Sequence, residues 1–169
     1  MIFFRKNEMQ RKRSLVAASL IAIAAMVLPG CATLPSPEVM KTETANFQLP
    51  KLPEAGKAMV YVVRPSMVGG LVRFNVFMDD QEAPSEMGYT RSNQYIYFSV
   101  PPGKHKLYSK AENWADTEFV ANAGDIIFVQ QEPMMGIVMA RNNLSQLDEV
   151  QGKYQVKTLQ LGTVLKTEK

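Results

Sequence analysis

The sequence predicts an all-β fold: a small antiparallel β-sandwich of about seven to eight strands, with a weak C-terminal helix. From residue 57 onward, short runs rich in Val, Ile, Tyr and Phe are separated at close intervals by Gly, Pro, Asn and Asp, which is typical of antiparallel strands. The chain has 169 residues, enough for one ordinary domain and an appendage. We divide it into a signal peptide (1–30), a tether (31–56), a β-sandwich domain (57–160) and a tail (161–169).

Residues 1–30 have the features of a cleaved signal peptide. A basic stretch at 5–13 precedes a mostly apolar run of 14 residues at 15–28. A membrane-spanning helix needs about 20 apolar residues, so this run suits the apolar region of a signal peptide. The alternative is a retained membrane anchor followed by a free thiol, which a run of this length fits less well.

The apolar run ends in Leu28-Pro29-Gly30-Cys31, which resembles the bacterial lipobox, although Pro29 departs from the usual small residue. The resemblance implies cleavage before Cys31 and lipidation of its thiol with acyl chains such as palmitate. Each buried CH₂ contributes about 0.8 kcal/mol to membrane binding, so two or three chains make a firm anchor. In lipoproteins of this kind an Asp after the cysteine retains the protein in the inner membrane. Ala32 stands there instead, so we expect an outer-membrane anchor with the domain facing the periplasm.

The tether, residues 31–56, is predicted to be an extended stalk. It holds prolines at positions 35, 37, 50 and 53 with few large apolar residues, so it buries too little surface to fold alone. Phe47 and Leu49 are the exceptions, and we expect them to dock on the domain as an added edge strand.

The domain is predicted to hold strands separated by turn residues. Residues 58–64 are nearly all apolar, as in a central strand, whereas 71–79 and 95–100 alternate. Residues 101–104 suit a type II turn with Gly103 at its left-handed position. Residues 144–159 have a weak helical spacing interrupted by Gly152, and the last residues are expected to fray. The other expected strands are 81–83, 105–110, 117–121, 125–131 and 135–141.

Five short motifs resemble those of the DUF2846 family, bacterial lipoprotein-like domains with patterns VYxxRP, VxxDG, PGxH and AGxxYYV. The resemblance covers roughly residues 55–155 and implies an all-β sandwich with no assigned catalytic activity. Asp80 stands where the family has glycine, which predicts a different hairpin turn, and the aromatic pair of the last motif is replaced. The matching segments are KAMVYVVRPS at 57–66, VFMD at 76–79, YIYF at 95–98, VPPGKH at 100–105 and NAGDIIFV at 122–129.

Charge and residue counts exclude several function classes. Five of the 19 basic residues and one of the 16 acidic residues precede residue 14, leaving 14 basic against 15 acidic side chains. A nucleic-acid-binding face is therefore not expected. Because Cys31 and His105 are the sole cysteine and histidine, the chain has no internal disulfide and no Cys/His zinc cluster. We expect no enzyme activity, no metal and no cofactor.

Three groups of side chains are possible sites, but a structural role explains each of them more simply. His105 lies between two lysines without a nucleophile, so we interpret it as fixing a turn. The acidic group lacks the spacing of a calcium loop and is interpreted as a solvated hairpin tip, with calcium as the alternative. Met134, Met135 and Met139 are expected to pack in the core or at an interface rather than to bind Cu(I). The acidic group consists of Asp79, Asp80, Glu82 and Glu86.

The candidate binding residues are Tyr95, Tyr97 and Trp114. The two tyrosines point away from the Ile96/Phe98 side of their strand, and Trp114 follows a polar turn. Exposed aromatic rings anchor protein partners or stack on sugars, although the same rings can simply pack inside a covered sheet. We predict a non-enzymatic binding or structural module for an envelope partner. The alternative is a receptor for a small ligand or glycan such as peptidoglycan.

Overall fold

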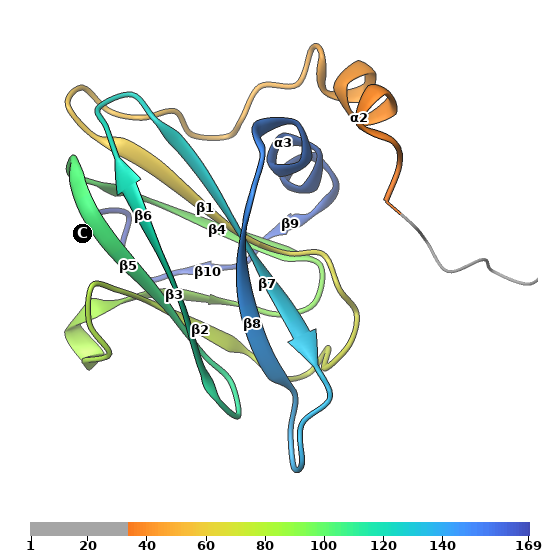
Figure 1. The fold of residues 1–169 in the computed structure, drawn as a ribbon, viewed down its shortest axis with the longest axis vertical. Coiled ribbons are helices and arrows are strands. Elements are labelled where there is room, and N and C mark those ends of the chain that lie inside the picture. The colour runs from red at the N-terminus through yellow and green to blue at the C-terminus, as the bar shows by residue number, and fades with distance from the viewer. Residues whose placement is uncertain (1–33) are drawn as a thin grey trace, which may run out of the picture. The chain divides into compact units, whose positions relative to one another are not determined.

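The computed structural model describes residues 34–169 and confirms the β-sandwich. Two five-stranded sheets have the orders β8-β7-β1-β4-β9 and β10-β3-β2-β5-β6 (Figure 1). The predicted lipidation site, Cys31, lies outside the described residues. The elements are α2 (Pro37–Thr44), β1 (Ala58–Arg64), β2 (Phe74–Met78), η2 (Ala83–Ser85), β3 (Glu86–Thr90), β4 (Gln94–Val100), β5 (Gly103–Lys110), β6 (Trp114–Ala121), β7 (Ile126–Met134), β8 (Arg141–Leu147), α3 (Glu149–Thr158), β9 (Gln160–Leu161) and β10 (Thr163–Val164).

Strand β1 is the centre of the first sheet. All seven of its residues are buried, as expected for a strand covered on both faces. It pairs antiparallel with β4, where Tyr61 lies opposite Tyr97, and parallel with β7, where Tyr61 lies opposite Phe128. The β1/β7 pair and the β4/β9 pair are the parallel exceptions in a mostly antiparallel sandwich.

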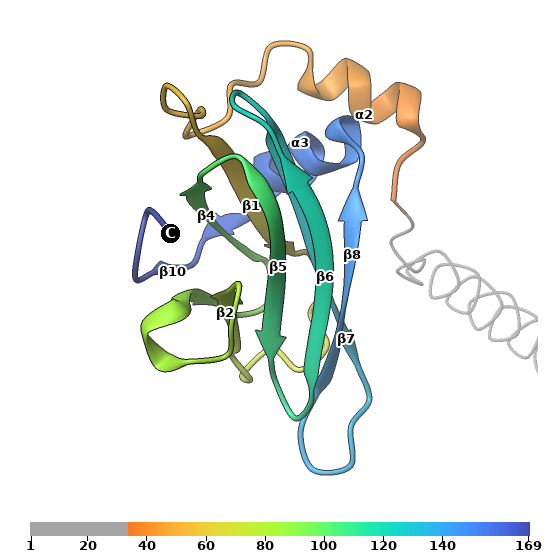
Figure 2. The same cartoon turned by 60° about the vertical axis from the view of Figure 1, so that its left-hand side comes forward.

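The apolar side chains form two clusters, one on each face of the first sheet. The main core lies between the sheets and includes Val60, Val76, Phe98, Leu107 and Val129. The second cluster lies on the outer face of the first sheet, under α3 and the segment that follows α2 (Figure 2). Its buried members are Leu49, Met59, Tyr61, Val63, Tyr95, Phe128 and Val156.

The expectation of an extended stalk was wrong for part of the tether, because Pro37–Thr44 forms helix α2. Ser36 caps it, Pro37 occupies its first turn where proline is favoured, and Met40 is buried. Farther along, Phe47 and Leu49 do dock on the domain, but their backbone forms no strand. None of the helices within residues 34–169 has the length and apolarity needed to cross a bilayer.

Four other local predictions were wrong. Of the strand expected at 135–141, residues 135–140 form a connection and Arg141 begins β8. The strand expected at 81–83 begins at Glu86, after a short 3₁₀ turn. Gly103 has φ of 151°, far from the value of about 80° that a type II turn requires. The tail is not frayed: β9 and β10 extend one sheet each, and the Lys169 N–H donates to the Ser99 carbonyl at 3.0 Å. The predicted C-terminal helix is present but shorter, as α3.

Candidate functional site

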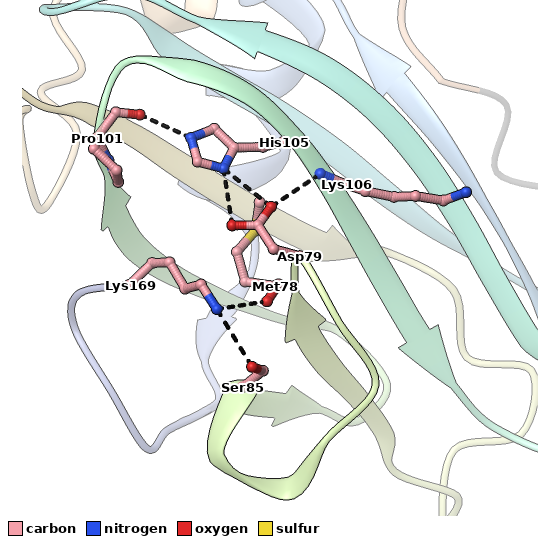
Figure 3. Close-up of polar contacts among 7 residues, drawn as sticks. All are labelled: Met78, Asp79, Ser85, Pro101, His105, Lys106 and Lys169. Carbon is pink, nitrogen blue, oxygen red and sulfur yellow. Dashed lines mark hydrogen bonds and ion pairs between the residues drawn. The ribbon is translucent and has the colours of Figure 1, made fainter.

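Asp79 and His105, which lie 26 residues apart in the sequence, form a paired site between the β2 and β5 strands (Figure 3). His105 Nδ1 lies 3.0 and 3.1 Å from the two carboxylate oxygens of Asp79. His105 Nε2 lies 2.8 Å from the Pro101 carbonyl, and the backbone N–H of Lys106 donates to Asp79 at 3.1 Å. The imidazole is almost fully buried and packs on the Phe119 ring.

The backbone brings Asp79 into this position. It directly follows β2 and has φ of 68°, a left-handed conformation that Asp tolerates better than most residues. Asp80, which stands where glycine was expected from the family pattern, is not among the positive-φ residues of the described chain. The left-handed position of this hairpin is therefore Asp79 and not Asp80. Because the residue after Asp79 needs no positive φ, Asp80 can replace the glycine of the family pattern.

The partners of His105 define what the pair can do. Both ring nitrogens of His105 lie within hydrogen-bond distance of protein oxygens, Nδ1 of the Asp79 carboxylate and Nε2 of the Pro101 carbonyl. Because both nitrogens are engaged by groups of the protein, this geometry does not favour the ring as a general base. The predicted role of His105 in fixing the turn is confirmed by its bond to Pro101. A depression of about 540 Å³ adjoins the pair.

The acidic group does not behave as one solvated hairpin tip. Asp79 pairs with His105, which corrects that interpretation for this residue, and Glu86 accepts from the Asn75 amide at 2.6 Å. Hydrogen bonds from the Ser85 hydroxyl and the Glu82 backbone N–H hold the pKa of Asp80 below its ordinary value. Within residues 34–169, no cluster of three His, Cys, Asp or Glu side chains is placed to hold a metal ion.

The three predicted binding residues do not share a face. Tyr95 and Tyr97 do point away from the main core, but α3 covers this side of the sheet and leaves Tyr95 only 7% exposed. Tyr97 is partly buried beside the ring of Tyr61. Trp114 lies on β6 of the other sheet and is 37% exposed. The prediction that these three residues share one binding face is therefore wrong. Helix α3 covers the side of the first sheet that holds the tyrosines, and Trp114 belongs to the second sheet.

Trp114 belongs instead to an aromatic group on the outer face of the second sheet. Its ring lies 5.2 Å from that of Phe77 and 6.4 Å from that of Tyr108, both with edge-on geometry. The ammonium group of Lys110 lies 4.8 Å from the centre of the indole ring. The Trp114 ring is therefore held in place by two aromatic neighbours, lies beside the ammonium group of Lys110, and is still partly exposed.

Arg64, the arginine of the VYxxRP-like motif, is fully buried at the end of β1. Its guanidinium stacks over the Phe74 ring at 3.7 Å, and its Nη atoms donate to the carbonyls of Val68 (3.1 Å), Gly69 (2.8 Å) and Val72 (2.7 Å). Burial lowers the pKa of Arg64 to about 10, and the guanidinium stays protonated at neutral pH. Its function here is to hold the β1–β2 connection.

A second connection, between β7 and β8, is held by a carboxylate, that of Glu112. Glu112 accepts hydrogen bonds from three consecutive backbone N–H groups, those of Ile137 (3.1 Å), Val138 (2.9 Å) and Met139 (2.7 Å). These bonds, that from Met139 foremost, keep the pKa of Glu112 below its ordinary value. The two connections abut, because a Cβ on Gly69 would collide with Ala140.

Together the two connections form an exposed apolar surface, which we call the apolar end. The β1–β2 connection contributes Met67, Val68 and Leu71. The β7–β8 connection contributes Met135, Ile137, Val138 and Met139, next to Met134, the last residue of β7. Leu71, Ile137, Met135 and Val138 are 95%, 91%, 88% and 85% exposed, respectively, which is unusual for neighbouring large apolar side chains.

The apolar end was missed because residues 135–141 were interpreted as a strand. Packing of Met134, Met135 and Met139 in the core is wrong, since all three are exposed; packing at an interface stays a prediction. The available signal was Gly136 in an apolar run without alternation. The Asp79–His105 pair was missed because each residue was considered by itself, although both lie in motifs that carry the family resemblance.

Residues 54–143 match the family described as a protein of unknown function (DUF2846). The match spans more than half of the 169 residues. The chain belongs to the DUF2846 family. It is also similar to an uncharacterized protein of Haemophilus influenzae, with 26% identity over 151 residues, 89% of this chain and 86% of the relative. The DUF2846 segment contains Arg64, Asp79, His105, Glu112 and both connections of the apolar end, whereas α2 and α3 lie outside it.

Proposed function

We propose that this chain is a lipid-anchored, non-enzymatic binding module of the bacterial envelope that docks a partner through its apolar end. The observation that carries the proposal is the exposure of large apolar side chains on two connections whose backbones are held in place. Arg64 and Glu112 each form hydrogen bonds with several backbone groups of these connections. These bonds fix the backbone that carries the exposed apolar side chains.

The anchoring part of the proposal rests on the sequence. The basic stretch, the apolar run and the cysteine at its end favour processing to a lipoprotein acylated at Cys31. Ala32 after that cysteine favours the outer membrane. A Cys31→Ser variant is expected to lose incorporation of a labelled palmitate analogue and to leave the membrane fraction. An unchanged label would count against lipidation at this residue.

Photo-crosslinking in living cells tests the docking surface. A photoreactive amino acid is placed at Ile137 in the apolar end and, as the matched control, at Val120, a side chain of β6 that is 60% exposed. We expect a discrete adduct from position 137 and none from position 120. If position 137 gives no adduct, or only the adducts that position 120 also gives, the apolar end is not a docking surface.

The alternative function is a glycan receptor, and the grouping of Trp114 with Tyr108 and Phe77 supports it. Partly exposed aromatic rings stack on the faces of sugars. Titrating the intrinsic fluorescence of Trp114, the sole tryptophan, with muropeptides tests this function. A saturable change that is lost in Tyr108→Ala would support it, and an unchanged spectrum would count against it.

A further inference from the structure

We infer that the partner of the apolar end is the surface of a phospholipid bilayer with anionic headgroups. The inference rests on the proposed function and specifies its partner. It rests on three properties of one part of the molecule: apolar side chains that protrude, backbone groups that are bonded by the protein's own side chains, and positive charges around the protruding side chains.

The apolar side chains protrude at one end of the domain. The β7–β8 connection extends beyond the other strands, at the end opposite to α2 and α3 (Figure 1, Figure 2). Its exposed residues are Met, Ile and Val, with no Tyr or Trp. Protein interfaces take most of their binding energy from Trp, Tyr and Arg in packed pockets, whereas aliphatic side chains on a convex surface suit insertion between acyl chains.

Six backbone groups of the apolar end are satisfied by side chains of the protein. The carboxylate of Glu112 accepts the N–H groups of residues 137–139, and Arg64 donates to carbonyls of residues 68, 69 and 72. Polar backbone groups without a partner are costly in hydrocarbon. These two side chains remove that cost for six backbone groups before any membrane is met.

Positive side chains surround the apolar end. Arg73 and Lys110 line a depression of about 370 Å³ together with Leu71 and Met139. Arg141 is the first residue of β8 after the connection, and its side chain lies against Gly136.

Arg91 belongs to the β3–β4 turn, which reaches the same end through the bond from the Ser92 hydroxyl to the Ser66 carbonyl. The nearby acids are Glu112 and Glu132, which accept hydrogen bonds from neutral groups of the protein and are outnumbered by the four cations Arg73, Arg91, Lys110 and Arg141. A surplus of cations next to apolar side chains is the arrangement that binds anionic lipid.

Site-specific tryptophan fluorescence of the full chain tests the inference. Trp114→Phe removes the sole native tryptophan, and a reporter is then introduced by Ile137→Trp or, as the control, by Val120→Trp. Both proteins carry the same N-terminal residues, so any membrane affinity of that segment is equal in the two. The vesicles contain equal parts of phosphatidylglycerol and phosphatidylethanolamine, or phosphatidylcholine alone.

The emission of the reporter at position 137 is expected to move to shorter wavelength and to be quenched by brominated acyl chains in the anionic vesicles. The reporter at position 120 is expected to change in neither respect. Adding Val138→Asp to the position-137 protein is expected to weaken the lipid-dependent change at least tenfold, because a charge must then enter hydrocarbon. Replacing Arg73 and Arg141 by glutamine is expected to weaken it about fivefold per charge, and circular dichroism checks that each variant is folded.

Two outcomes would overturn the inference. In the first, position 137 responds to vesicles no more than position 120 does, while crosslinking in cells still captures a protein from position 137; the bilayer is then wrong and the docking module stands. In the second, neither lipid nor protein contacts position 137, and the inference and the proposed function fail together. An equal response to neutral and anionic vesicles would overturn the role assigned to the cations.

Discussion

Replacing Gly152 by alanine is expected to destabilise the protein, although helix propensity alone predicts the opposite. Gly152 lies inside α3, where a Gly→Ala change ordinarily gains about 1 kcal/mol. At this position the helix rests on the ring of Phe128, and a Cβ would come under 3.0 Å from three ring carbons. Glycine is therefore what allows α3 to approach the first sheet.

The collision is not easily relieved. Phe128 is 2% exposed, and its ring stacks on that of Tyr61 with centroids 5.6 Å apart. Overpacking of a core costs about 1–3 kcal/mol, so subtracting the gain in helix propensity of about 1 kcal/mol leaves a net loss of up to about 2 kcal/mol. For a domain of this size each kcal/mol lowers the melting temperature by about 3–5 °C.

Urea denaturation of the full chain, followed by circular dichroism, measures the effect. Gln151→Ala on the same helix is the control, because it raises helix propensity without facing Phe128. In a Phe128→Ala background the ring is gone, and Gly152→Ala is then expected to be neutral or stabilising. If Gly152→Ala stabilises the protein with Phe128 in place, as helix propensity predicts, the packing argument is refuted.

Three further predictions follow from the described contacts. His105→Ala is expected to lower the free energy of unfolding by about 1–2 kcal/mol in urea titrations, because Asp79 and the Pro101 carbonyl lose a hydrogen-bond partner, while Asp79 is 34% exposed and recovers part of its solvation. Lys104→Ala, an exposed neighbour, should change it by less than about 0.5 kcal/mol. Burial raises the pKa of Tyr61 to about 12 from an ordinary value of 10, so the unfolded state loses this proton first, and the contribution of Tyr61 is full below pH 10 and lost as pH rises to 12. Alkaline unfolding curves should show this loss in the native chain and not in Tyr61→Phe. Ile137→Ser should leave the melting temperature within about 2 °C, since the side chain is 91% exposed; a larger fall would mean that it packs within the domain.

Much of the fold could be predicted from the sequence because it is encoded in local patterns. The bounds of β1 agree with the prediction at both ends, and β4 differs by one residue, since continuous or alternating apolar residues report directly on burial. Gly152 was treated as a weakness of the predicted helix. In the structure it is the contact point of α3, a role that becomes visible only with Phe128 in place.

The candidate site was less predictable, because its members are distant in the sequence. Asp79 and His105 are 26 residues apart, and Glu112 is 25 to 27 residues from the N–H groups that it binds. The two tyrosines were placed on the correct side of their strand, but their exposure depended on where α3 would lie. The sequence of a single strand shows which side chains lie on each of its two sides. It does not show which other segment of the chain covers each side.

The sequence by itself determined the fold class, because a pattern of short apolar runs and turn residues depends on composition and short-range periodicity. Cleavage after residue 30 and lipidation of Cys31 stay predictions from local patterns of the same kind. Only the tertiary structure decided that Tyr95 is covered, that Asp79 meets His105, and that the apolar residues near Ile137 remain in solvent. These outcomes depend on the packing of whole elements against one another and on long-range bonds from side chains to backbone. Each such contact depends on two segments that are distant in the sequence, so the pattern of either segment alone does not predict it.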